Sequence, residues 1–336
     1  MFFLNPPRKS SIQLRTVKNN FRVIDYPGHL SGIRFLPSFL SNIFDKRLVS
    51  SLQSAIDVKF DVVWSFDNSR FFHLNVFGDD VLKICHIVDH NQNFQTKAHA
   101  ASADLCLTTS EYILNRIILY NKRVHNIGHG YNFKKKSRDS CTSLPGANKI
   151  KALYVGNLLY PTIDYLQLLN IIHTFPRIDF CFIGPIKSSN LGTSTNDLHF
   201  HVEQLRNMPN TYLLGPKPAD ELSDWLDSAN ILFFVYKESE RIQMANPHKM
   251  MEYLGSGKPI ICSYTHEYRN LPKDLIHMAR SNHMLPALFS KVSNDLSYYS
   301  SSSVSEARKA VAYNNSYEKQ IIRIENLIEE THASEQ

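Results

Sequence analysis

The chain has 336 residues, of which 43% are hydrophobic and 20% charged, and a formal net charge of +6. Single cores rarely grow past about 250 residues, so this length predicts two domains. No apolar run approaches the roughly 18 residues of a membrane-spanning helix, and MFFLNPPRKS lacks the apolar core and cleavage site of a secretory signal. We therefore expect a cytoplasmic protein that is neither exported nor membrane-spanning.

The first 60 residues carry nine Lys or Arg against three Asp, so the basic excess is local. Such a surface can attract nucleic acid, anionic lipid or phosphorylated small molecules. Apolar residues then follow at helical spacing and predict one apolar stripe: Phe35, Leu36, Phe39, Leu40, Ile43 and Phe44. We expect this helix to pack its stripe on its own sheet; the alternative is a helix that lies on a bilayer surface.

From about residue 60, short apolar runs alternate with helix-like stretches. The runs are DVVWSF, LKICHIV, DLCLTTS, RVHNIG, IKALYV, DFCFIG, TYLLG, NILFFVY and KPIICS. Continuous apolar runs are typical of strands buried on both faces, and their alternation with helices favours parallel, doubly wound α/β sheets in both halves.

The cysteines are far apart and mostly lie inside such apolar runs: Cys85, Cys106, Cys141, Cys181 and Cys262. A thiol in an apolar run behaves as a small hydrophobe, so we expect reduced core residues and no metal site.

A polar stretch without periodicity, residues 134–149, predicts an exposed linker. We therefore expect a first domain over residues 1–147 and a second over residues 148–315. The last segment, residues 316–336, predicts a helix with an apolar stripe formed by Ile321, Ile322, Ile324, Leu327 and Ile328.

Residues 229–263 combine a buried strand, a polar loop, a helix and another strand. Asn246 is a good N-cap and Pro247 suits a first helical turn, so a helix is predicted from there to Gly255 or Gly257. Its N-terminus would face the carboxyl end of the preceding strand. In an open α/β sheet that edge is the ligand crevice, where free N–H groups and the helix dipole favour a phosphate.

Lys249 and Glu252 are three residues apart on this predicted helix. One helical face would present a cation near the phosphate and, one turn deeper, a carboxylate able to accept hydrogen bonds from both hydroxyls of a ribose. The spacing alone fits a solvated ion pair as well, which contributes only a few tenths of a kcal/mol.

The string NPHKMMEYLGSGKPII resembles the donor-site helix of GT-B glycosyltransferases. Other segments resemble the same fold in the same order: ADLCLTTSEYI and VHNIGHGYNF near the end of an acceptor domain, then YVGNLLYPTIDYLQLLNIIHTFPRIDFCFIGP and LLGPKPADELSDWLDSANILFFVY in a donor domain. The resemblance covers about residues 80–263 and, more weakly, the final helix, which in such enzymes crosses back to the N-terminal domain. It implies two Rossmann-like domains that face a cleft.

Carried over residue by residue, the resemblance implies that Glu252 binds the ribose and that Lys249 lies near the diphosphate. Gly156 and Asn157 would form the glycine turn that faces the sugar phosphates. The backbone from Gly215 to Lys217 would border the base.

A nest of backbone N–H groups over residues 246–249, which starts at Asn246, would hold pyrophosphate oxygens. Charge builds on the leaving diphosphate during glycosyl transfer, so cations around the helix start are further candidates. They are Lys237, Arg241, His248 and Lys249; each alone also fits a solvated surface charge.

Two features depart from the large retaining family 4. Its members often carry an Arg and a Lys after the GNL-like turn and a second Glu eight residues before the ribose Glu, whereas here residues 158–164 hold no cation and the earlier position is Met244. An inverting reaction would need a base for the acceptor hydroxyl. Asp89 in HIVDHNQNF is the candidate, because VDH resembles the VDD or VDE motif of some envelope-polysaccharide transferases; the alternative is a helix N-cap.

GT-B enzymes normally begin with a strand, a glycine-containing loop and a helix, but only FFLNPP precedes the basic segment. We expect an atypical or shortened N-terminal domain.

The resemblance implies transfer of a sugar, without a cofactor, from a UDP- or GDP-linked nucleoside-diphosphate sugar to a saccharide or lipid-linked saccharide in cell-envelope or exopolysaccharide synthesis. The basic segment adds an expected contact with anionic lipid on the inner face of the cell membrane. The alternatives are a nucleotide-sugar epimerase or hydrolase of the same fold, and a catalytically silent scaffold subunit of a polysaccharide assembly complex. Nucleic-acid binding ranks last, because no aromatic RNA-binding signature, helix-turn-helix or zinc motif is present.

Overall fold

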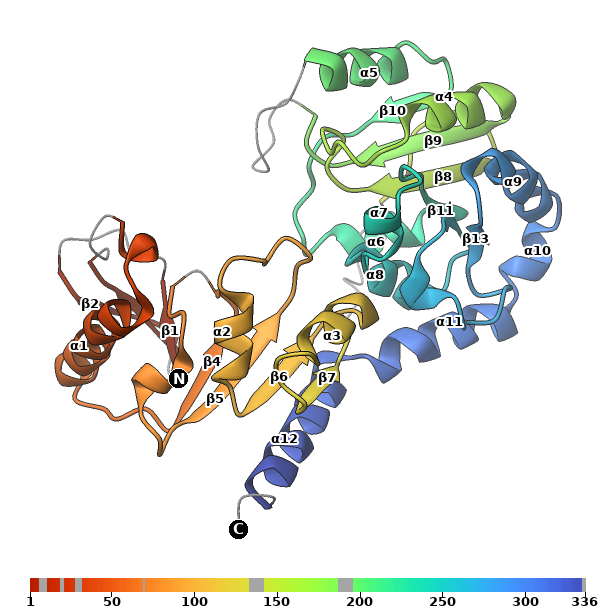
Figure 1. The fold of residues 1–336 in the computed structure, drawn as a ribbon. Coiled ribbons are helices and arrows are strands. Elements are labelled where there is room, and N and C mark those ends of the chain that lie inside the picture. Colours follow the sequence, from red (N-terminus) through yellow and green to blue (C-terminus); the bar gives the residue numbers. More distant parts are fainter. Residues whose placement is uncertain are drawn as a thin grey trace. The chain divides into compact units, whose positions relative to one another are not determined.

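A computed structural model describes residues 1–5, 11–18, 21–27, 32–68, 70–132, 142–186 and 196–333 (Figure 1). Contacts within the chain divide it into two compact units. Unit 1 comprises Met1–Thr109 and Ile113–Asn126, and unit 2 comprises Ser110–Tyr112 and Ile127–Ser334. The domain boundary expected at 147/148 and the return of residues 316–336 to the first domain stay predictions, and part of the predicted linker lies outside the described residues.

Unit 1 contains two β-sheets. In the smaller sheet the strand order is β1-β3-β2, with β1 parallel and β2 antiparallel to β3. These strands are β1 (Phe2–Leu4), β2 (Gln13–Lys18) and β3 (Phe21–Asp25). The larger sheet is parallel and follows chain order, β4-β5-β6-β7. Its strands are β4 (Val62–Ser65), β5 (Leu82–Ile87), β6 (Leu105–Thr108) and β7 (Val124–Asn126).

The main core of unit 1 lies where α2 (Thr96–Ala101) and α3 (Glu111–Ile117) meet one face of the parallel sheet. Cys85 and Cys106 lie opposite each other on β5 and β6 and belong to this core. The prediction of buried, reduced cysteines is confirmed for these two and for Cys181 and Cys262, whereas Cys141 lies outside the described residues.

Helix α1 (Ser38–Ile56) does not bury the stripe that the sequence predicts. Its buried positions are Ser41, Asp45, Val49, Leu52 and Ile56. Four positions of the predicted stripe are exposed: Phe35, Leu36, Phe39 and Ile43. The expectation that the stripe packs on its own sheet is therefore wrong for these four, because the helix turns a different face toward the small sheet.

Unit 2 is built on a six-stranded parallel sheet with the order β10-β9-β8-β11-β12-β13. The order reverses between β8 and β11, which makes their carboxyl ends the topological switch point where ligands of open α/β sheets bind. The strands are β8 (Ile150–Val155), β9 (Ile178–Ile183), β10 (Thr211–Leu213), β11 (Ile231–Phe234), β12 (Ile260–Ser263) and β13 (His277–Ala279). The predicted apolar runs coincide with all of these strands except β13.

The helices of unit 2 connect these strands and close the chain. They are α4 (Tyr165–Thr174), α5 (Asn196–Arg206), α6 (Leu222–Asp227), α7 (Glu240–Gln243), α8 (Lys249–Ser256), α9 (Leu285–Asn294), α10 (Leu296–Tyr299), α11 (Ser302–Asn314) and α12 (Tyr317–Ala333). Of the predicted stripe on α12, Ile324 is buried while Ile321 and Ile322 are exposed. Within the described residues, no helix is long and apolar enough to cross a membrane.

Helix α8 is fixed at its C-terminal end by a buried arginine of α11. Gly257 ends α8 in a left-handed conformation with φ 75°, which confirms the predicted stop. The fully buried Arg308 donates hydrogen bonds to the backbone oxygens of Gly257, Asp274, Leu275 and Tyr299. The carbonyl groups of Gly257 and Tyr299 lie at the ends of α8 and α10, which leave them without a helical partner, so the position of α8 is tied to the rest of unit 2.

Candidate functional site

Glycines follow the first three strands of unit 2 and bring three backbone turns together. Gly156 N donates to Ile183 O at 2.8 Å, and Gly184 N donates to Gly215 O at 3.0 Å. A Cβ atom on Gly184 would lie 1.9 Å from Gly156 O, so only glycine allows this approach. Sequence reasoning missed Gly184, although a glycine directly after a buried strand was a usable signal. The result is a rim of closely packed glycine backbone at the switch point.

Lys249, the first residue of α8, is directed toward the same rim. Its Nζ atom lies 4.0 Å from the ring centre of Tyr154 and 5.2 Å from that of Tyr236. A Cβ atom on Gly156 would lie only 2.7 Å from Nζ. The fold therefore brings together two residues that are 93 positions apart in the sequence, and places an ammonium group at the glycine turn.

The ammonium group of Lys249 is held by aromatic rings rather than by a carboxylate. Within the described part of the chain it has no hydrogen bond or ion pair, and its nearest partners are ring faces. Burial lowers the pKa of Lys249 to about 7, and the negative charge of Glu252 opposes only part of this shift. An anion bound at the glycine turn would favour the charged form, so the arrangement suits a phosphate group.

A hydrogen-bond network fixes the strand ends around Lys249. Val155 N donates to Tyr253 Oη at 2.9 Å, which ties α8 to the end of β8. Asn282 Nδ2 donates to Tyr236 O at 2.7 Å and to Asp164 Oδ2 at 2.8 Å, and its Oδ1 accepts from Ser263. Because Asn282 is buried and fully bonded, the backbone of the loop after β11 is held in one place.

The start of α8 differs from the prediction. The helix begins at Lys249 with His248 at the N-cap position, so the expectation that Asn246 caps it is wrong. Asn246 Oδ1 instead accepts from Tyr268 Oη at 2.7 Å, and Asn246 O accepts from His129 Nε2 at 3.0 Å. His129 stacks on His248 with ring centres 3.6 Å apart. The amide of Asn246 therefore holds the loop before the helix, which sequence reasoning could not see.

Glu252 is exposed on α8, one turn after Lys249. Tyr131 lies beside it: burial first and the charge of Glu252 second raise the pKa of Tyr131. A Cβ atom on Gly255 would lie 2.2 Å from the Tyr131 ring, so this glycine allows the close contact. The carboxylate is accessible to a ligand, as ribose recognition would require.

The structure gives fewer contacts for the remaining predicted donor-site residues of unit 2. Asn157 Oδ1 accepts from Leu159 N at 2.8 Å and so shapes the glycine turn. Lys217 Nζ lies 4.8 Å from the ring centre of Trp225 on α6. Arg241 is exposed on the short helix α7.

Asp89 follows β5 in unit 1 and is exposed. Its Oδ1 accepts from Asn91 N at 2.8 Å, so the side chain closes a turn and does not cap α2, which begins at Thr96. Gln92 holds the same turn, because its Oε1 accepts from Val88 N and Asp89 N and its Nε2 donates to Phe66 O. The carboxylate is thus anchored through one oxygen beside the loop that follows β4.

Two exposed aromatic side chains, missed from the sequence, lie on that neighbouring segment. The rings of Trp64 and Phe66 are nearly parallel at 11°, with centres 5.6 Å apart, and are 39% and 48% exposed. Trp64 Nε1 donates to His86 Nδ1 at 3.3 Å, and burial lowers the pKa of His86 to about 4. The indole donor is therefore used, and what Trp64 offers outward is apolar ring surface. The alternation in DVVWSF was the available signal.

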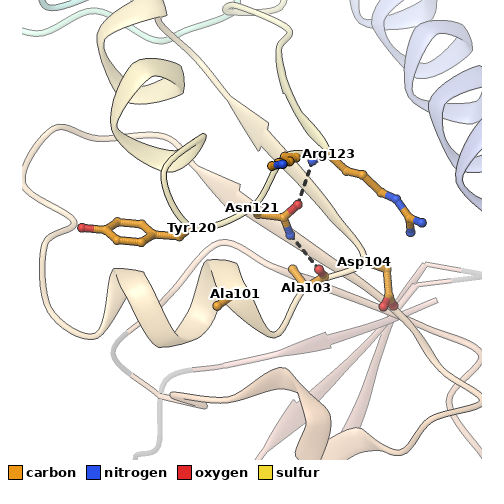
Figure 2. Close-up of a pocket in the computed structure, with 7 residues that line it drawn as sticks. Ala101, Ala103, Asp104, Tyr120, Asn121 and Arg123 are labelled. Carbon is orange, nitrogen blue, oxygen red and sulfur yellow. Dashed lines mark hydrogen bonds between the residues drawn. The ribbon is translucent and has the colours of Figure 1, made fainter.

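Figure 2 shows a pocket of unit 1 that none of the predicted site residues lines. It lies where β6 and β7 begin, and Asn121 braces it: its Nδ2 donates to Ala103 O at 2.7 Å and its Oδ1 accepts from Arg123 N at 2.8 Å. Ligands of parallel α/β sheets bind at the carboxyl ends of strands, which is the opposite edge. We therefore do not assign a function to this pocket. Within the described ranges, no group of three His, Cys, Asp or Glu could hold a metal ion.

Comparison with known proteins shows the fold. No family model matches the chain. The chain is 23% identical over 167 residues, 47% of its length, to TuaH of Bacillus subtilis (strain 168), a candidate teichuronic acid biosynthesis glycosyltransferase; the match spans 40% of TuaH, well under two thirds of its length.

Three solved structures superpose over nearly the whole chain. Sucrose-phosphate synthase from Thermosynechococcus elongatus has a TM-score of 0.70 at 12% identity, covering 99% of this chain and 89% of its own. A glycosyltransferase from Rickettsia africae has a TM-score of 0.66 at 13% identity, covering 92% and 84%. Anabaena HepE in complex with UDP and glucose has a TM-score of 0.64 at 13% identity, covering 94% and 86%. The predicted α/β fold with two Rossmann-like domains of the GT-B type is confirmed.

Proposed function

We propose that this GT-B chain is a glycosyltransferase that moves a sugar from a UDP- or GDP-linked donor to a saccharide or lipid-linked saccharide acceptor in cell-envelope or exopolysaccharide synthesis. The observation that carries the proposal is the position of Lys249 Nζ at the Gly156 turn, where the strand order reverses. A switch point lined by glycine backbone and one cation is suited to a diphosphate. HepE, of similar fold, holds UDP and glucose, and TuaH is named for teichuronic acid biosynthesis.

In this proposal the donor binds at the glycine rim of unit 2. Lys249, which lies at the turn of Gly156 and Asn157, neutralises the diphosphate, and Arg241 is a further cation near the start of α8. Burial lowers the pKa of His248, so its ring is a neutral hydrogen-bonding group there. Charge develops on the diphosphate as the sugar–phosphate bond breaks, so these groups stabilise the transition state more than the ground state.

The nucleoside part of the donor is assigned to groups on either side of Lys249. Glu252 accepts hydrogen bonds from the two ribose hydroxyls. The backbone from Gly215 to Lys217 borders the base. Asn246 acts indirectly, because it holds the loop before α8 through Tyr268 and His129.

The acceptor side of the proposal rests on unit 1. In an inverting transfer, the bond from the anomeric carbon to the diphosphate breaks with its electron pair on the leaving group. The acceptor oxygen then forms the new glycosidic bond, and its proton passes to a base. Asp89 is our candidate base, because one carboxylate oxygen is anchored in the turn and the residue is exposed. The outer faces of Trp64 and Phe66 offer apolar surface to a sugar ring.

We further propose that the chain works in the cytoplasm and is peripheral on the inner face of the cell membrane, where a lipid-linked acceptor would be presented. The excess of basic residues within the first 60 positions supports this placement, because anionic lipids and diphosphate-linked acceptors are both negatively charged.

Calorimetric titration with UDP and GDP, followed by donor turnover with and without acceptor saccharides, tests the proposal. We expect one nucleoside diphosphate to bind in the micromolar range and turnover to require an acceptor. Turnover that needs no acceptor would instead indicate an epimerase or hydrolase, and binding without turnover a silent scaffold subunit.

Glu252→Ala provides a residue-level test of the same site. We expect donor affinity to fall about tenfold or more with little change of melting temperature, because the side chain is exposed. Glu306→Ala, an exposed carboxylate on α11, is the matched control. Unchanged donor binding in Glu252→Ala would remove the ribose role.

A further inference from the structure

Large apolar groups are exposed on one side of α1 and on the turn that precedes it. The exposed fractions are 79% for Phe35, 64% for Phe39 and 45% for Ile43. Phe39 and Ile43 are one turn apart and share one side of the helix, whereas Phe35 lies on the separate turn Ile33–Phe35 that precedes it. We call Phe35, Leu36, Phe39, Ile43, Lys46 and Arg47 the α1 outer face. Exposed apolar groups that gather in this way mark an interaction surface.

The opposite side of α1 already anchors the helix. Leu52 and Ile56 pack with Ile24 of β3 and with Tyr26 just after that strand, and Val49 belongs to the main core of unit 1. The helix therefore needs nothing from Phe39 or Ile43 to hold its position. These side chains are free to contact something outside the chain without unfolding it.

The basic residues of α1 are exposed on the same side as its exposed apolar groups, and its acidic residue is buried. Lys46 and Arg47 are exposed one turn after Ile43. Asp45 is the one acidic residue of this helix, and it is fully buried. The exposed ionised groups of α1 are thus all cationic and directly follow Phe39 and Ile43. Apolar groups followed by cations match a surface that is apolar inside and anionic where it meets water.

We propose that the α1 outer face docks on an anionic lipid bilayer, with Phe35 and Phe39 in the boundary between headgroups and acyl chains and Lys46 and Arg47 against lipid phosphates. Phenylalanine and leucine on one side with Lys and Arg beside them is the pattern of helices that lie in a membrane interface. A stable protein partner needs about 800 Å² from each side, more than four apolar side chains of one convex helix provide. A bilayer adapts to a convex surface. This inference rests on the membrane placement proposed above, to which it assigns a surface, and it is independent of glycosyl transfer.

Co-sedimentation of the full chain with phosphatidylcholine vesicles, with and without phosphatidylglycerol, tests the proposal in the absence of any nucleotide. We expect binding to the anionic vesicles only. Phe39→Ser with Ile43→Ser should weaken that binding at least tenfold. The matched control is Leu166→Ser with Phe200→Ser, which removes two apolar groups of unit 2 that are 76% and 62% exposed; it should bind as the unchanged chain does.

The cationic contribution is tested by Lys46→Glu with Arg47→Glu. We expect at least a tenfold loss on anionic vesicles at low salt and a smaller loss at high salt, because salt screens the attraction. Lys149→Glu with Arg177→Glu makes the same change of net charge at exposed positions of unit 2 and should bind nearly normally. An equal loss in both pairs would show that net charge alone matters, and would overturn the proposed surface.

Two further outcomes would also overturn the proposal. One is the absence of vesicle binding by the unchanged chain. The other is a dimer in sedimentation analysis that Phe39→Ser with Ile43→Ser dissociates while vesicle binding stays normal, which would give the face to a second copy. Nucleotide affinity, measured on every variant, should stay unchanged, so a failure of membrane docking and a failure of the donor site are told apart.

Discussion

In both units the parallel strands end at one edge of the sheet, but different chemical groups line that edge in each unit. In unit 2 the edge is glycine backbone, and its cation, Lys249, is enclosed by Tyr154 and Tyr236. In unit 1 the edge carries an exposed carboxylate, Asp89, beside the exposed rings of Trp64 and Phe66. Under the proposed function, the charged diphosphate is bound by fixed backbone and a half-buried cation, whereas the acceptor sugar is bound by apolar ring surface beside a carboxylate.

The largest expected effect concerns the cation of unit 2. Lys249→Met should lower kcat/KM at least 100-fold, about 3 kcal/mol, because it removes the charge placed at the glycine turn. The melting temperature should change little, since methionine fills much of the same space among the rings. Lys291→Met on α9 is the control. Steady-state kinetics with the identified donor measure kcat/KM. A near-normal value in Lys249→Met would contradict the role of this cation in unit 2.

The next largest effect is a difference between the two units in the stability that each loses at low pH. Burial lowers the pKa of His86 and of His99 in unit 1, and of His277 in unit 2, each to about 4. Between the unfolded value of about 6.5 and 4 the unfolded chain binds more protons, so stability falls as pH falls through this window. Burial also lowers the pKa of His248 in unit 2. With two histidines of pKa about 4 in unit 1 against one in unit 2, unit 1 should still lose more, a difference of roughly 1–2 kcal/mol.

The two tryptophans allow this acid effect to be measured unit by unit. Trp64 lies in unit 1 and Trp225 in unit 2, and the chain has no others. Urea unfolding of Trp64→Phe and Trp225→Phe at pH 7 and pH 5 should show a larger drop of midpoint for the unit 1 signal. Asp179, whose pKa is lowered below 3.8, stays ionised in this window and should not confuse the result. Equal drops would contradict the prediction.

Donor binding should depend on pH through Lys249. With a pKa of about 7 in the free protein, the group is charged below pH 7 and progressively neutral above it. An anionic donor binds the charged form, so affinity should fall by up to tenfold per pH unit above about 7, or about 1.4 kcal/mol. Titrations of nucleoside diphosphate at pH 6.5, 7.5 and 8.5 measure this slope. Lys249→Met should abolish the slope, and a slope that persists in that variant would assign it to another group.

The smallest effect is expected from the aromatic edge of unit 1. Trp64→Ala should raise the KM for acceptor about tenfold, roughly 1.4 kcal/mol, and leave the KM for donor unchanged, because stacking on one ring adds modestly to binding. Trp225→Ala is the reciprocal control, since Trp225 lies beside Lys217 in unit 2. A change in donor rather than acceptor KM would break the proposed division of labour.

The sequence predicted more of the candidate site in unit 2 than of the one in unit 1. The string NPHKMMEYLGSGKPII placed α8, its stop at Gly257 and the pairing of Lys249 with Glu252 on one helix, because helix periodicity and end signals are local. It misplaced the cap, since Asn246 is held by Tyr268 and His129 from distant segments. Sequence reasoning missed Trp64, Phe66 and Gly184, whose role depends on which strand lies next to which.

By itself the sequence determined the parallel α/β layout, the strands of both main sheets except β13, and the helix that carries Lys249, because buried strands need continuous apolar runs wherever they lie. Only the tertiary structure decided that Gly156 and Lys249 meet, since a contact across 93 residues follows from strand order and not from spacing. It also decided that α1 turns Phe35, Phe39 and Ile43 outward. An amphipathic pattern states that an apolar side exists, but the side that is buried is the one that fits the available core.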